Sequence, residues 1–548
     1  MNPGPATMDP IAALDAPAAF AAGTHEAIAS LDRLGVPRRI WARDVTVWRK
    51  DPREISDRLG WLDVMGEMRR RRGEIREWTD GLQATGVRDV VLLGMGGSSL
   101  APEVFRRTFP AKSGRPALHV LDTTSSSWIR RVTAAVDLRH AHFLVASKSG
   151  TTIEVDTLFA HFRAAVEAAG VEAPGQSFTA ITDPGTPLVA RAREDGFRAT
   201  FVNPPDIGGR FSALSLFGLV PAAVLGVDLE ALLASAEAMA ASCGSDVSAA
   251  RSPGAVLGAF LGAAARDGRD KMTLLTASAV SSFGLWAEQL IAESTGKDDT
   301  GIVPVVGEPE VAASEYGDDR VFVAVGVAPG EDAAFERRVD ALRRAGQPIY
   351  RTWIGDLAGL GGEMFRWEMA TSIAGHLLGI HPFDQPDVQA AKTRTSEILA
   401  ALARGEKPAP VEPGNARALL GALRPGDWVG VMVYGDPTRT LTDAVADLRA
   451  GVERRWRAAT TFGLGPRFLH STGQLHKGGA NRGVFLQIVL AEEGLPVPGR
   501  PWGFRELMEA QADGDLAALR ERGRRAARLV IGRDPAQAVR ALVDTLRP

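Results

Sequence analysis

The hexapeptide S-K-S-G-T-T at positions 147–152 has the composition of an anion-binding turn. It follows the apolar run 143–146 and opens a segment with helical character that extends to about residue 169. The first free N–H groups of a helix point out of its start, and the helix dipole favours negative charge there. A helix cap needs only one hydroxyl side chain, whereas this turn has four hydroxyl groups and one ammonium group. The pattern therefore favours a phosphate site over a simple cap, with the candidate ligands Ser147, Lys148, Ser149, Thr151 and Thr152.

Two other side chains have types suited to moving a proton and stabilising charge. Arg210 follows a glycine pair in a Pro-rich loop, which favours a placed cation over an ordinary surface arginine. Glu293 ends a largely apolar helical stretch, with Gln289 one turn earlier on the same face. A solvated glutamate at a helix end is the commoner case. The polar turn S-T-G-K that follows nevertheless favours a general base.

The turn G-M-G-G-S-S at 94–99 also follows an apolar run and opens a helical stretch. A dinucleotide-binding turn would need a third glycine where Ser99 stands, and a P-loop would need a Gly-Lys-Ser/Thr ending, so both interpretations fail. What remains is a close approach of the backbone to a small ligand beside Gly97 and Ser98.

Gln385 and Lys392 form a further candidate pair. They are seven residues apart, so a single helix would place them two turns apart on one face. The alternative is a helix cap followed by an exposed lysine.

Alternating strand and helix patterns position these motifs. We expect strands at 90–93, 119–122, 143–147 and 180–182, then at 271–276, 320–325 and 348–351, and finally at 429–434 and 484–490. The chain is expected to end in Arg-rich helices. This alternation predicts a doubly wound α/β fold, in which ligands bind beyond the carboxyl ends of the strands.

Changes in composition divide the chain. We expect a helical leader at 1–60, a first domain at 61–245, a second at 246–407 after a small, polar boundary, and a C-terminal α/β extension at 416–548 after a Pro-rich linker.

Composition excludes several classes of protein. The chain has 548 residues, a net charge of −3 and 45% hydrophobic residues, so we expect neither nucleic acid nor an anionic membrane as a partner. It shows no apolar run long enough to span a bilayer and no signal-peptide pattern. Cys243 is the only cysteine, so an internal disulfide cannot form. We therefore expect a cytoplasmic location.

Five motifs in order give the chain a family resemblance. G-M-G-G-S-S, S-K-S-G-T-T, G-G-R-F-S, E-Q-L-I-A-E-S-T-G-K and P-F-D-Q-P-D-V-Q-A-A-K together resemble the glucose-6-phosphate isomerase family, over roughly residues 60 to 405. The segment H-S-T-G-Q-L-H-K-G-G is most similar to the isomerase module of transaldolase fusion proteins. The resemblance implies two doubly wound, parallel-sheet sugar isomerase domains in a three-layer arrangement, with the C-terminal α/β unit added. It also implies aldose–ketose isomerisation by proton transfer through a cis-enediol, without a metal or an organic cofactor.

The resemblance assigns roles to the candidate residues. Glu293 would be the base that moves a proton between C2 and C1, and Arg210 would stabilise the enediolate. Lys392 would lie near the ring oxygen. The residues implied to bind the sugar or its phosphate are Gly97, Ser98, Ser147, Lys148, Ser149, Thr151, Thr152, Gln289 and Gln385. The partner implied is a small sugar phosphate, and the implied assembly is a homodimer.

One expected residue is absent. The family opens the sugar ring with a histidine about 20–30 residues after the base, and this chain has no histidine between Glu293 and His376. Our hypothesis is that His476 takes this role, with Lys477 or His470 as possible contributors. The alternative is that the loop only packs on the core.

Three functions stay open at this point. The first is interconversion of glucose 6-phosphate and fructose 6-phosphate, and the second is a relaxed isomerase that also accepts mannose 6-phosphate. The third is a non-catalytic regulator that binds a sugar phosphate.

Overall fold

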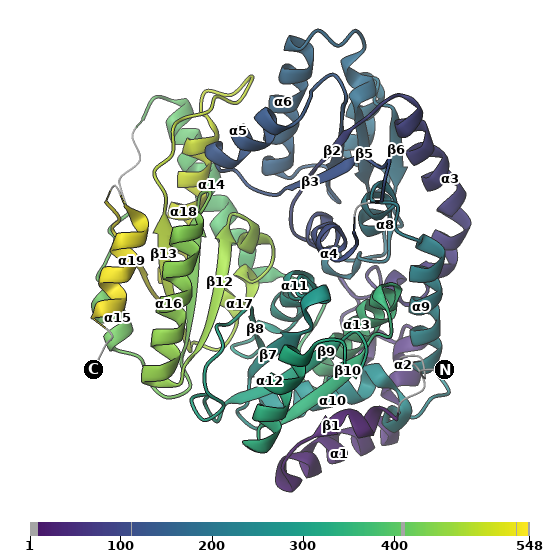
Figure 1. The fold of residues 1–548 in the computed structure, drawn as a ribbon, viewed down its shortest axis with the longest axis vertical. Coiled ribbons are helices and arrows are strands. Elements are labelled where there is room, and N and C mark those ends of the chain that lie inside the picture. Colours follow the sequence, from purple (N-terminus) through teal and green to yellow (C-terminus); the bar gives the residue numbers. More distant parts are fainter. Residues whose placement is uncertain (1–8, 111, 407–410, 533, 546–548) are drawn as a thin grey trace.

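Three parallel sheets organise the chain, each in its own α/β unit (Figure 1). The computed structural model describes residues 9–110, 112–406, 411–532 and 534–545. In the first sheet the strand order is β3-β2-β4-β5-β6, and all neighbours are parallel. These strands are β2 (Asp89–Gly94), β3 (Ala117–Leu121), β4 (Ala141–Ala146), β5 (Phe178–Thr182) and β6 (Ala199–Val202).

The second sheet has the order β1-β10-β9-β7-β8. Its strands are β7 (Lys271–Thr276), β8 (Val303–Val306), β9 (Arg320–Gly326), β10 (Ile349–Trp353) and β1 (Leu14–Asp15). Strand β1 pairs with β10 in the antiparallel direction, whereas the other pairs are parallel. The segment predicted as a helical leader thus also contributes an edge strand to the second sheet.

The third sheet has the order β12-β11-β13-β14 and is parallel throughout. Its strands are β11 (Trp428–Tyr434), β12 (Ala459–Gly465), β13 (Gly483–Val489) and β14 (Arg525–Arg528). In all three units the first parallel strand lies between the second and the third, and the fourth lies outside the third. The C-terminal unit therefore repeats the strand order of the other two, which is that of a doubly wound fold.

Helices cover both faces of the first sheet, because its strands are apolar on both faces. On β2, Val90 and Leu92 join one core and Val91 and Leu93 join another. One face is covered by α5 (Ser126–Ala135), α6 (Ile153–Ala168) and α7 (Pro187–Glu194). The other is covered by α3 (Val64–Ala84), α4 (Leu100–Thr108) and α8 (Leu216–Val224), within a core that continues into the second unit.

The remaining helices connect or cover the second and third units. They are α1 (Ala18–Arg33), α2 (Val36–Trp41), α9 (Leu229–Ser242), α10 (Pro253–Arg266), α11 (Phe283–Thr295), α12 (Ala333–Arg344), α13 (Leu360–Leu378), α14 (Gln389–Ala403), α15 (Ala416–Gly421), α16 (Arg439–Trp456), α17 (Gly473–Gly478), α18 (Phe504–Glu521) and α19 (Pro535–Asp544). Helices α15, α16 and α19 share the core on one face of the third sheet. Its other face packs against α17, α18 and the second unit, through Ala292 of α11 and Val303 and Val305 of β8.

The third unit also reaches into the first. Val497 and Phe504 lie in the core that α5, α6 and α7 cover. Arg467 donates two hydrogen bonds of 2.7 Å each to the buried Asp122 carboxylate, just after β3. These contacts fix the third unit against the carboxyl end of the first sheet.

The predicted architecture, with two doubly wound parallel sheets and an additional C-terminal α/β unit, is confirmed. Five strands that the sequence patterns did not predict are β1, β6, β8, β12 and β14, and each lies at the edge of its sheet. The predicted C-terminal helices are α18 and α19, and strand β14, which the sequence patterns did not predict, lies between them. Part of the predicted linker, at 407–410, lies outside the described residues.

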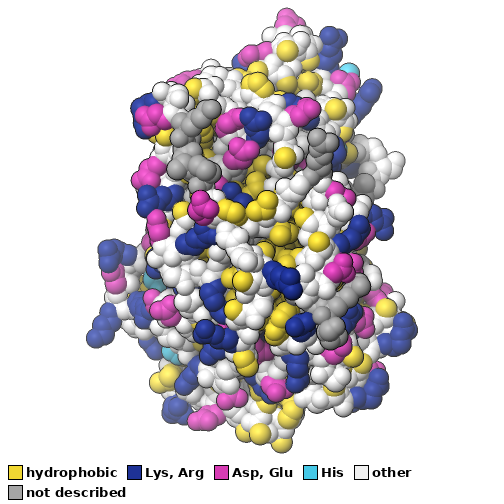
Figure 2. Space-filling model, turned by 90° about the vertical axis from the view of Figure 1, so that its left-hand side faces the viewer, with side chains coloured by type: hydrophobic (Ala, Val, Ile, Leu, Met, Phe, Trp, Pro, Cys, Tyr) yellow, Lys and Arg dark blue, Asp and Glu magenta, His cyan; other side chains and the backbone are white. Residues whose placement is uncertain are grey.

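The surface and the helix lengths agree with a globular chain. Figure 2 displays one face of the molecule, on which basic and acidic side chains are interspersed around apolar ones. Of the helices that the structure describes, none combines the length and the apolar composition that crossing a bilayer requires.

A buried ion cluster between the second and third units generates a first prediction. Arg320 on β9 donates to both carboxylate oxygens of Glu308 (2.8 and 3.0 Å) and to Glu453 of α16 (2.9 Å), and all three side chains are fully buried. Arg320→Met leaves two buried carboxylates without this cation, so we expect a loss of about 3–5 kcal/mol in the free energy of unfolding, measured by urea denaturation. The control Arg439→Met removes an exposed arginine and should cost less than about 0.5 kcal/mol.

The loss in the free energy of unfolding of Arg320→Met should also depend on pH. Burial, reinforced by the charge of Glu308, raises the pKa of Glu453 to about 8. The charge of Arg320 lowers this pKa, so in Arg320→Met the folded state binds the proton more tightly than in wild type, and lowering the pH stabilises the variant more than it stabilises wild type. The deficit of Arg320→Met should therefore shrink as the pH falls from about 8 towards about 5. A deficit that is independent of pH would contradict this account.

Candidate active site

The turn after β4 forms one wall of a cavity of about 360 Å³. Ser149, Thr151 and Thr152 line this cavity, at the start of α6. Gly150 has φ +67°, a conformation that disfavours any side chain, and a Cβ there would also lie 3.0 Å from the backbone nitrogen of Leu188. The tight turn thus presents hydroxyl groups at the N-terminus of a helix, as a phosphate site requires.

The other two predicted phosphate ligands do not line the cavity. The Ser147 hydroxyl lies 3.0 Å from that of Thr152 and accepts a hydrogen bond of 3.1 Å from the Gly150 N–H. The Lys148 ammonium donates to the Asp183 carboxylate and to the Pro205 carbonyl. These two side chains stabilise the turn instead, because Ser147 bonds within the turn itself and Lys148 bonds Asp183 and Pro205 of the first unit.

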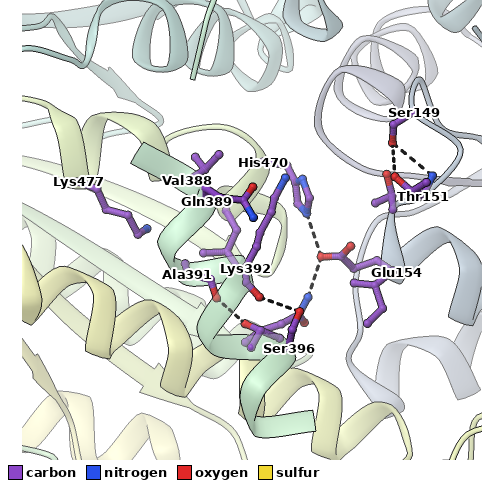
Figure 3. A pocket seen from close by; sticks show the side chains of 15 residues that line it. Ser149, Thr151, Glu154, Val388, Gln389, Ala391, Lys392, Ser396, His470 and Lys477 are labelled. Atoms are coloured by element: carbon purple, nitrogen blue, oxygen red, sulfur yellow. Dashed lines mark hydrogen bonds and ion pairs between the residues drawn. The ribbon is translucent and has the colours of Figure 1, made fainter. Parts of the chain in front are cut away.

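Helix α14 forms the opposite wall, with Gln389, Lys392, Thr395 and Ser396 among the lining residues (Figure 3). Among the described residues, the Lys392 ammonium has no hydrogen-bond or ion-pair partner, so it is available to an anionic ligand. The seven-residue spacing predicted that Gln385 and Lys392 share one helix face, and this prediction is wrong. Pro386 begins a separate 3₁₀ turn (Pro386–Val388), and α14 starts only at Gln389.

The third unit closes the cavity with Leu469, His470, Lys477 and Gln511. The His470 ring points across the cavity, and its Nε2 lies 2.9 Å from the Glu154 carboxylate of α6 (Figure 3). Burial alone would raise the pKa of Glu154, but the charge and hydrogen bond of His470 lower it below its usual range. Glu154 is therefore held ionised beside His470.

A second cluster of polar groups contains the predicted base and cation. Arg210 Nη1 lies 3.5 Å from Glu293 Oε1 and donates a hydrogen bond of 3.0 Å to Gln385 Oε1. Arg210 is only 3% exposed and also binds Ser294 Oγ (2.7 Å) and the Pro382 carbonyl (2.8 Å). The side chain of Glu293 is 12% exposed, so its carboxylate is near solvent but largely enclosed.

His470 connects the two groups of residues. Gln289 Nε2 donates to Glu293 Oε2 (3.0 Å) and to the His470 carbonyl (2.7 Å). A Cβ on Gly96 would lie 2.6 Å from that same carbonyl. The backbone of His470 therefore lies against the base and the glycine turn, while its ring faces the cavity.

The glycine turn after β2 packs against the loop that carries Arg210. A Cβ on Gly97 would lie 2.0 Å from the Gly209 carbonyl oxygen, so only glycine fits there. Ser98 is buried in the same turn. The predicted close approach of this backbone is thus a contact with the Arg210 loop, and it holds Gly97 and Ser98 beside the second cluster.

His476, the residue predicted to open a sugar ring, does not reach the cavity. Its ring lies among three aromatic rings, with centroids at 4.8 Å from Phe485 and at 5.8 Å from both Trp428 and Phe468. Burial lowers the pKa of His476 well below its usual value, which keeps the ring neutral. Helix α17 directs this side chain into the core, whereas His470 precedes the helix and faces the cavity.

Several residues that line the cavity were not predicted from the sequence, and Glu154 and Gln511 are two of them. Glu154 stands in the first turn of α6, where an acidic residue ordinarily complements the helix dipole, so its position alone was no signal. Gln511 lies in an amphipathic helix with no motif around it.

The donors that line the cavity are hydroxyl, amide, ammonium and imidazole groups, which suit a polyhydroxylated anion. Within the described part of the chain, no three His, Cys, Asp or Glu side chains are grouped so that they could hold a metal ion.

Comparisons with known proteins agree with this chemistry. The family model described as phosphoglucose isomerase matches residues 60–306. The glucose-6-phosphate isomerase of Rubrobacter xylanophilus is 32% identical over 371 residues, which cover 58% of this chain and 84% of that protein.

Two solved structures share the fold. A hypothetical protein from Thermus thermophilus superposes with a TM-score of 0.61 at 27% identity, over 71% of this chain and 100% of that one. A glucose-6-phosphate isomerase from Chlamydia trachomatis superposes with a TM-score of 0.53 at 20% identity, over 68% of this chain and 79% of that one.

The close approach of Gly97 to Gly209 generates a second prediction. Gly97→Ala would force two backbones apart and move the Arg210 loop, so we expect a loss of about 1–3 kcal/mol in the free energy of unfolding by urea denaturation. The matched control is Gly209→Ala, because a Cβ at Gly209 meets nothing within 4 Å. This control should change the unfolding free energy by less than about 0.5 kcal/mol. Equal effects of the two substitutions would show that the packing of the turns is not the cause.

Proposed function

Because the chain belongs to the phosphoglucose isomerase family, we propose that it interconverts glucose 6-phosphate and fructose 6-phosphate. The observation that carries the proposal is the contact of Glu293 with Arg210 at 3.5 Å, next to a cavity lined by hydroxyl groups. A carboxylate beside a buried cation suits a reaction in which a proton leaves carbon and negative charge develops on oxygen.

The phosphate group of the substrate would bind at the start of α6. Ser149, Thr151 and Thr152 offer hydroxyl groups there, and the helix N-terminus offers N–H groups. Lys392 on the opposite wall offers a cation. With the phosphate held at this end, the sugar chain would extend past His470 towards Glu293.

The proton transfer proceeds in two balanced steps. Glu293 takes the proton from C2 while negative charge moves to O1, which gives the cis-enediolate. The proton of the O2 hydroxyl then passes to O1, and Glu293 returns its proton to C1, which gives the ketose. Arg210 stabilises the negative charge on the enediolate oxygens, and Gln289 holds the Glu293 carboxylate in place. Gln385, bonded to Arg210, Gly97 and Ser98 would bind sugar hydroxyl groups.

Ring opening is assigned here to His470 in place of His476. The hydrogen bond from Nε2 to the ionised Glu154 leaves Nδ1 as the nitrogen that accepts a proton. In this role His470 takes the proton of the O1 hydroxyl and delivers a proton to the ring oxygen, so that the C1–O5 bond breaks. Lys392 would stabilise charge on the ring oxygen.

Subgroup, location and assembly are further parts of the proposal. The H-S-T-G-Q-L-H-K-G-G segment supports a place close to the isomerase modules of transaldolase fusion proteins. A cytoplasmic homodimer is proposed from the resemblance, and light scattering after size-exclusion chromatography tests the dimer.

Replacement of the base tests the reaction. In a coupled assay of fructose 6-phosphate conversion without added metal, Glu293→Gln should lower kcat by about 10²–10⁴-fold, with substrate binding retained by calorimetry. The control is Glu288→Gln on the same helix. Burial raises the pKa of Glu288 to about 8, so the glutamine resembles the protonated residue and should leave kcat unchanged near pH 7. A wild type that binds the substrate but never turns it over would identify a regulator instead.

The assignment of ring opening has its own test. The substrates are glucose 6-phosphate and its 4,5-dideoxy analogue, which lacks both ring-forming hydroxyl groups and stays open. His470→Ala should lower kcat on glucose 6-phosphate by about 10²-fold or more and affect the open analogue much less. His476→Ala, which enlarges an aromatic core, should change both rates by the same factor. Equal losses on both substrates for His470→Ala would rule out the assignment.

A further inference from the structure

A buried amide of the third unit connects two parts of the first. Gln511 on α18 donates from Nε2 to Glu154 Oε1 at 2.7 Å, and its Oε1 accepts from the Thr124 hydroxyl at 2.7 Å. All three side chains are buried. Thr124 follows β3, Glu154 lies in α6, and Gln511 lies about 360 residues further along the chain than Glu154.

These two bonds determine which way the amide faces. The Thr124 hydroxyl donates to Gln511 Oε1, so the NH₂ group must face Glu154. The reverse orientation would place the amide oxygen against an ionised carboxylate and leave that buried oxygen without a donor, which is costly. Glu154 Oε1 therefore receives hydrogen bonds from both Gln511 and His470.

We infer that Gln511 is a positioning residue for sugar-ring opening, which it supports by fixing the Glu154 carboxylate that orients the His470 ring. This inference rests on the proposed function of His470. Gln511 lines the cavity, but both polar atoms of its amide are bonded, to Thr124 and to Glu154, so we expect it to act through Glu154.

Helix α18 is well placed for this role. Four residues after Gln511, on the same face of α18, Asp515 accepts a hydrogen bond of 2.5 Å from the cavity-lining Lys477. Helix α18 also packs along α14, which carries Lys392 (Figure 1). One helix of the third unit thus fixes the carboxylate partner of His470 and the position of Lys477.

Two charged groups act most strongly on the pKa of Glu154. They are His470, at the turn before α17, and Lys392, on α14, while α18 contributes the neutral amide of Gln511. Lys477 of α17 and Asp515 of α18 pair with each other at the same cavity. If a carboxyl replaces the amide of Gln511, we therefore expect its pKa to depend mainly on the charge of Glu154.

The first test compares glucose 6-phosphate with the open 4,5-dideoxy analogue. Gln511→Ala should lower kcat on glucose 6-phosphate by about 10- to 100-fold, leave KM within about twofold, and change the rate on the open analogue by less than about twofold. The matched control is Gln487→Ala. Gln487 is another buried glutamine of the third unit, bonded through both amide atoms to Ala512 and Arg528, and it does not line the cavity. Its variant should leave the ratio of the two rates unchanged.

The second test uses pH. In Gln511→Glu the introduced carboxyl has a raised pKa, because it is buried beside an ionised carboxylate. While protonated it can donate to Glu154 as the amide does, and once ionised it repels Glu154. The activity of Gln511→Glu relative to wild type should therefore fall as the pH rises from about 6 to about 9, whereas relative activity of Gln511→Ala should not recover at low pH.

A further variant, Thr124→Val, tests the inference even if Gln511→Ala fails to fold. Thr124→Val keeps the side-chain shape and removes only the bond that orients the amide, so it should show a smaller loss with the same preference for the open analogue. A wild type without turnover would overturn the proposed function and this inference with it. A wild type with turnover, combined with Gln511→Ala or Thr124→Val losing equally on both substrates, would overturn this inference alone.

Discussion

The ion pair between Arg467 and Asp122 determines where the third α/β unit meets the first. Two parallel hydrogen bonds of 2.7 Å between buried, charged groups define both a distance and an orientation. The segment after Arg467 is thereby held over the carboxyl end of the first sheet. His470, three residues later, can then bond Glu154 with its ring and Gln289 with its carbonyl. The proposed site depends on this placement, because both of its clusters contact His470.

The first and third units share one strand order, so the contact between them can be described by which edge of each sheet takes part. An open α/β sheet ordinarily binds ligands beyond the carboxyl ends of its strands, and at this edge the first unit carries its glycine and hydroxyl turns. In the third unit, the carboxyl-end edge of the sheet packs against the first unit. Glu492, just after β13, accepts hydrogen bonds from Ser125 Oγ (2.5 Å) and the Ser127 N–H (3.1 Å) at the start of α5. The third unit thus uses the edge at which such sheets ordinarily bind ligands to contact the proposed site of its neighbour.

Prediction from the sequence succeeded where the signal was strong and continuous. The central strands β2, β4, β7, β9 and β11 are apolar runs because both of their faces are buried. The edge strands β6, β8, β12 and β14 have a neighbour on one side only and tolerate polar or small residues, as in Arg525–Arg528. Their pairing is stabilised by the strand beside them, which local periodicity cannot reveal.

The amino-acid sequence alone indicates the strand–turn–helix motif of the hydroxyl turn, the glycines that allow close backbone approach, and the pairing of Gln289 with Glu293 one helical turn apart. These features are local, so residue type and spacing suffice to specify them. Packing between distant segments pairs Lys148 with Asp183, turns His470 and not His476 towards the cavity, and brings Gln511 to Glu154, and the sequence patterns did not reveal any of these contacts. The physical reason is that burial and hydrogen-bond partners are set by packing between units, which brings together residues up to about 360 positions apart.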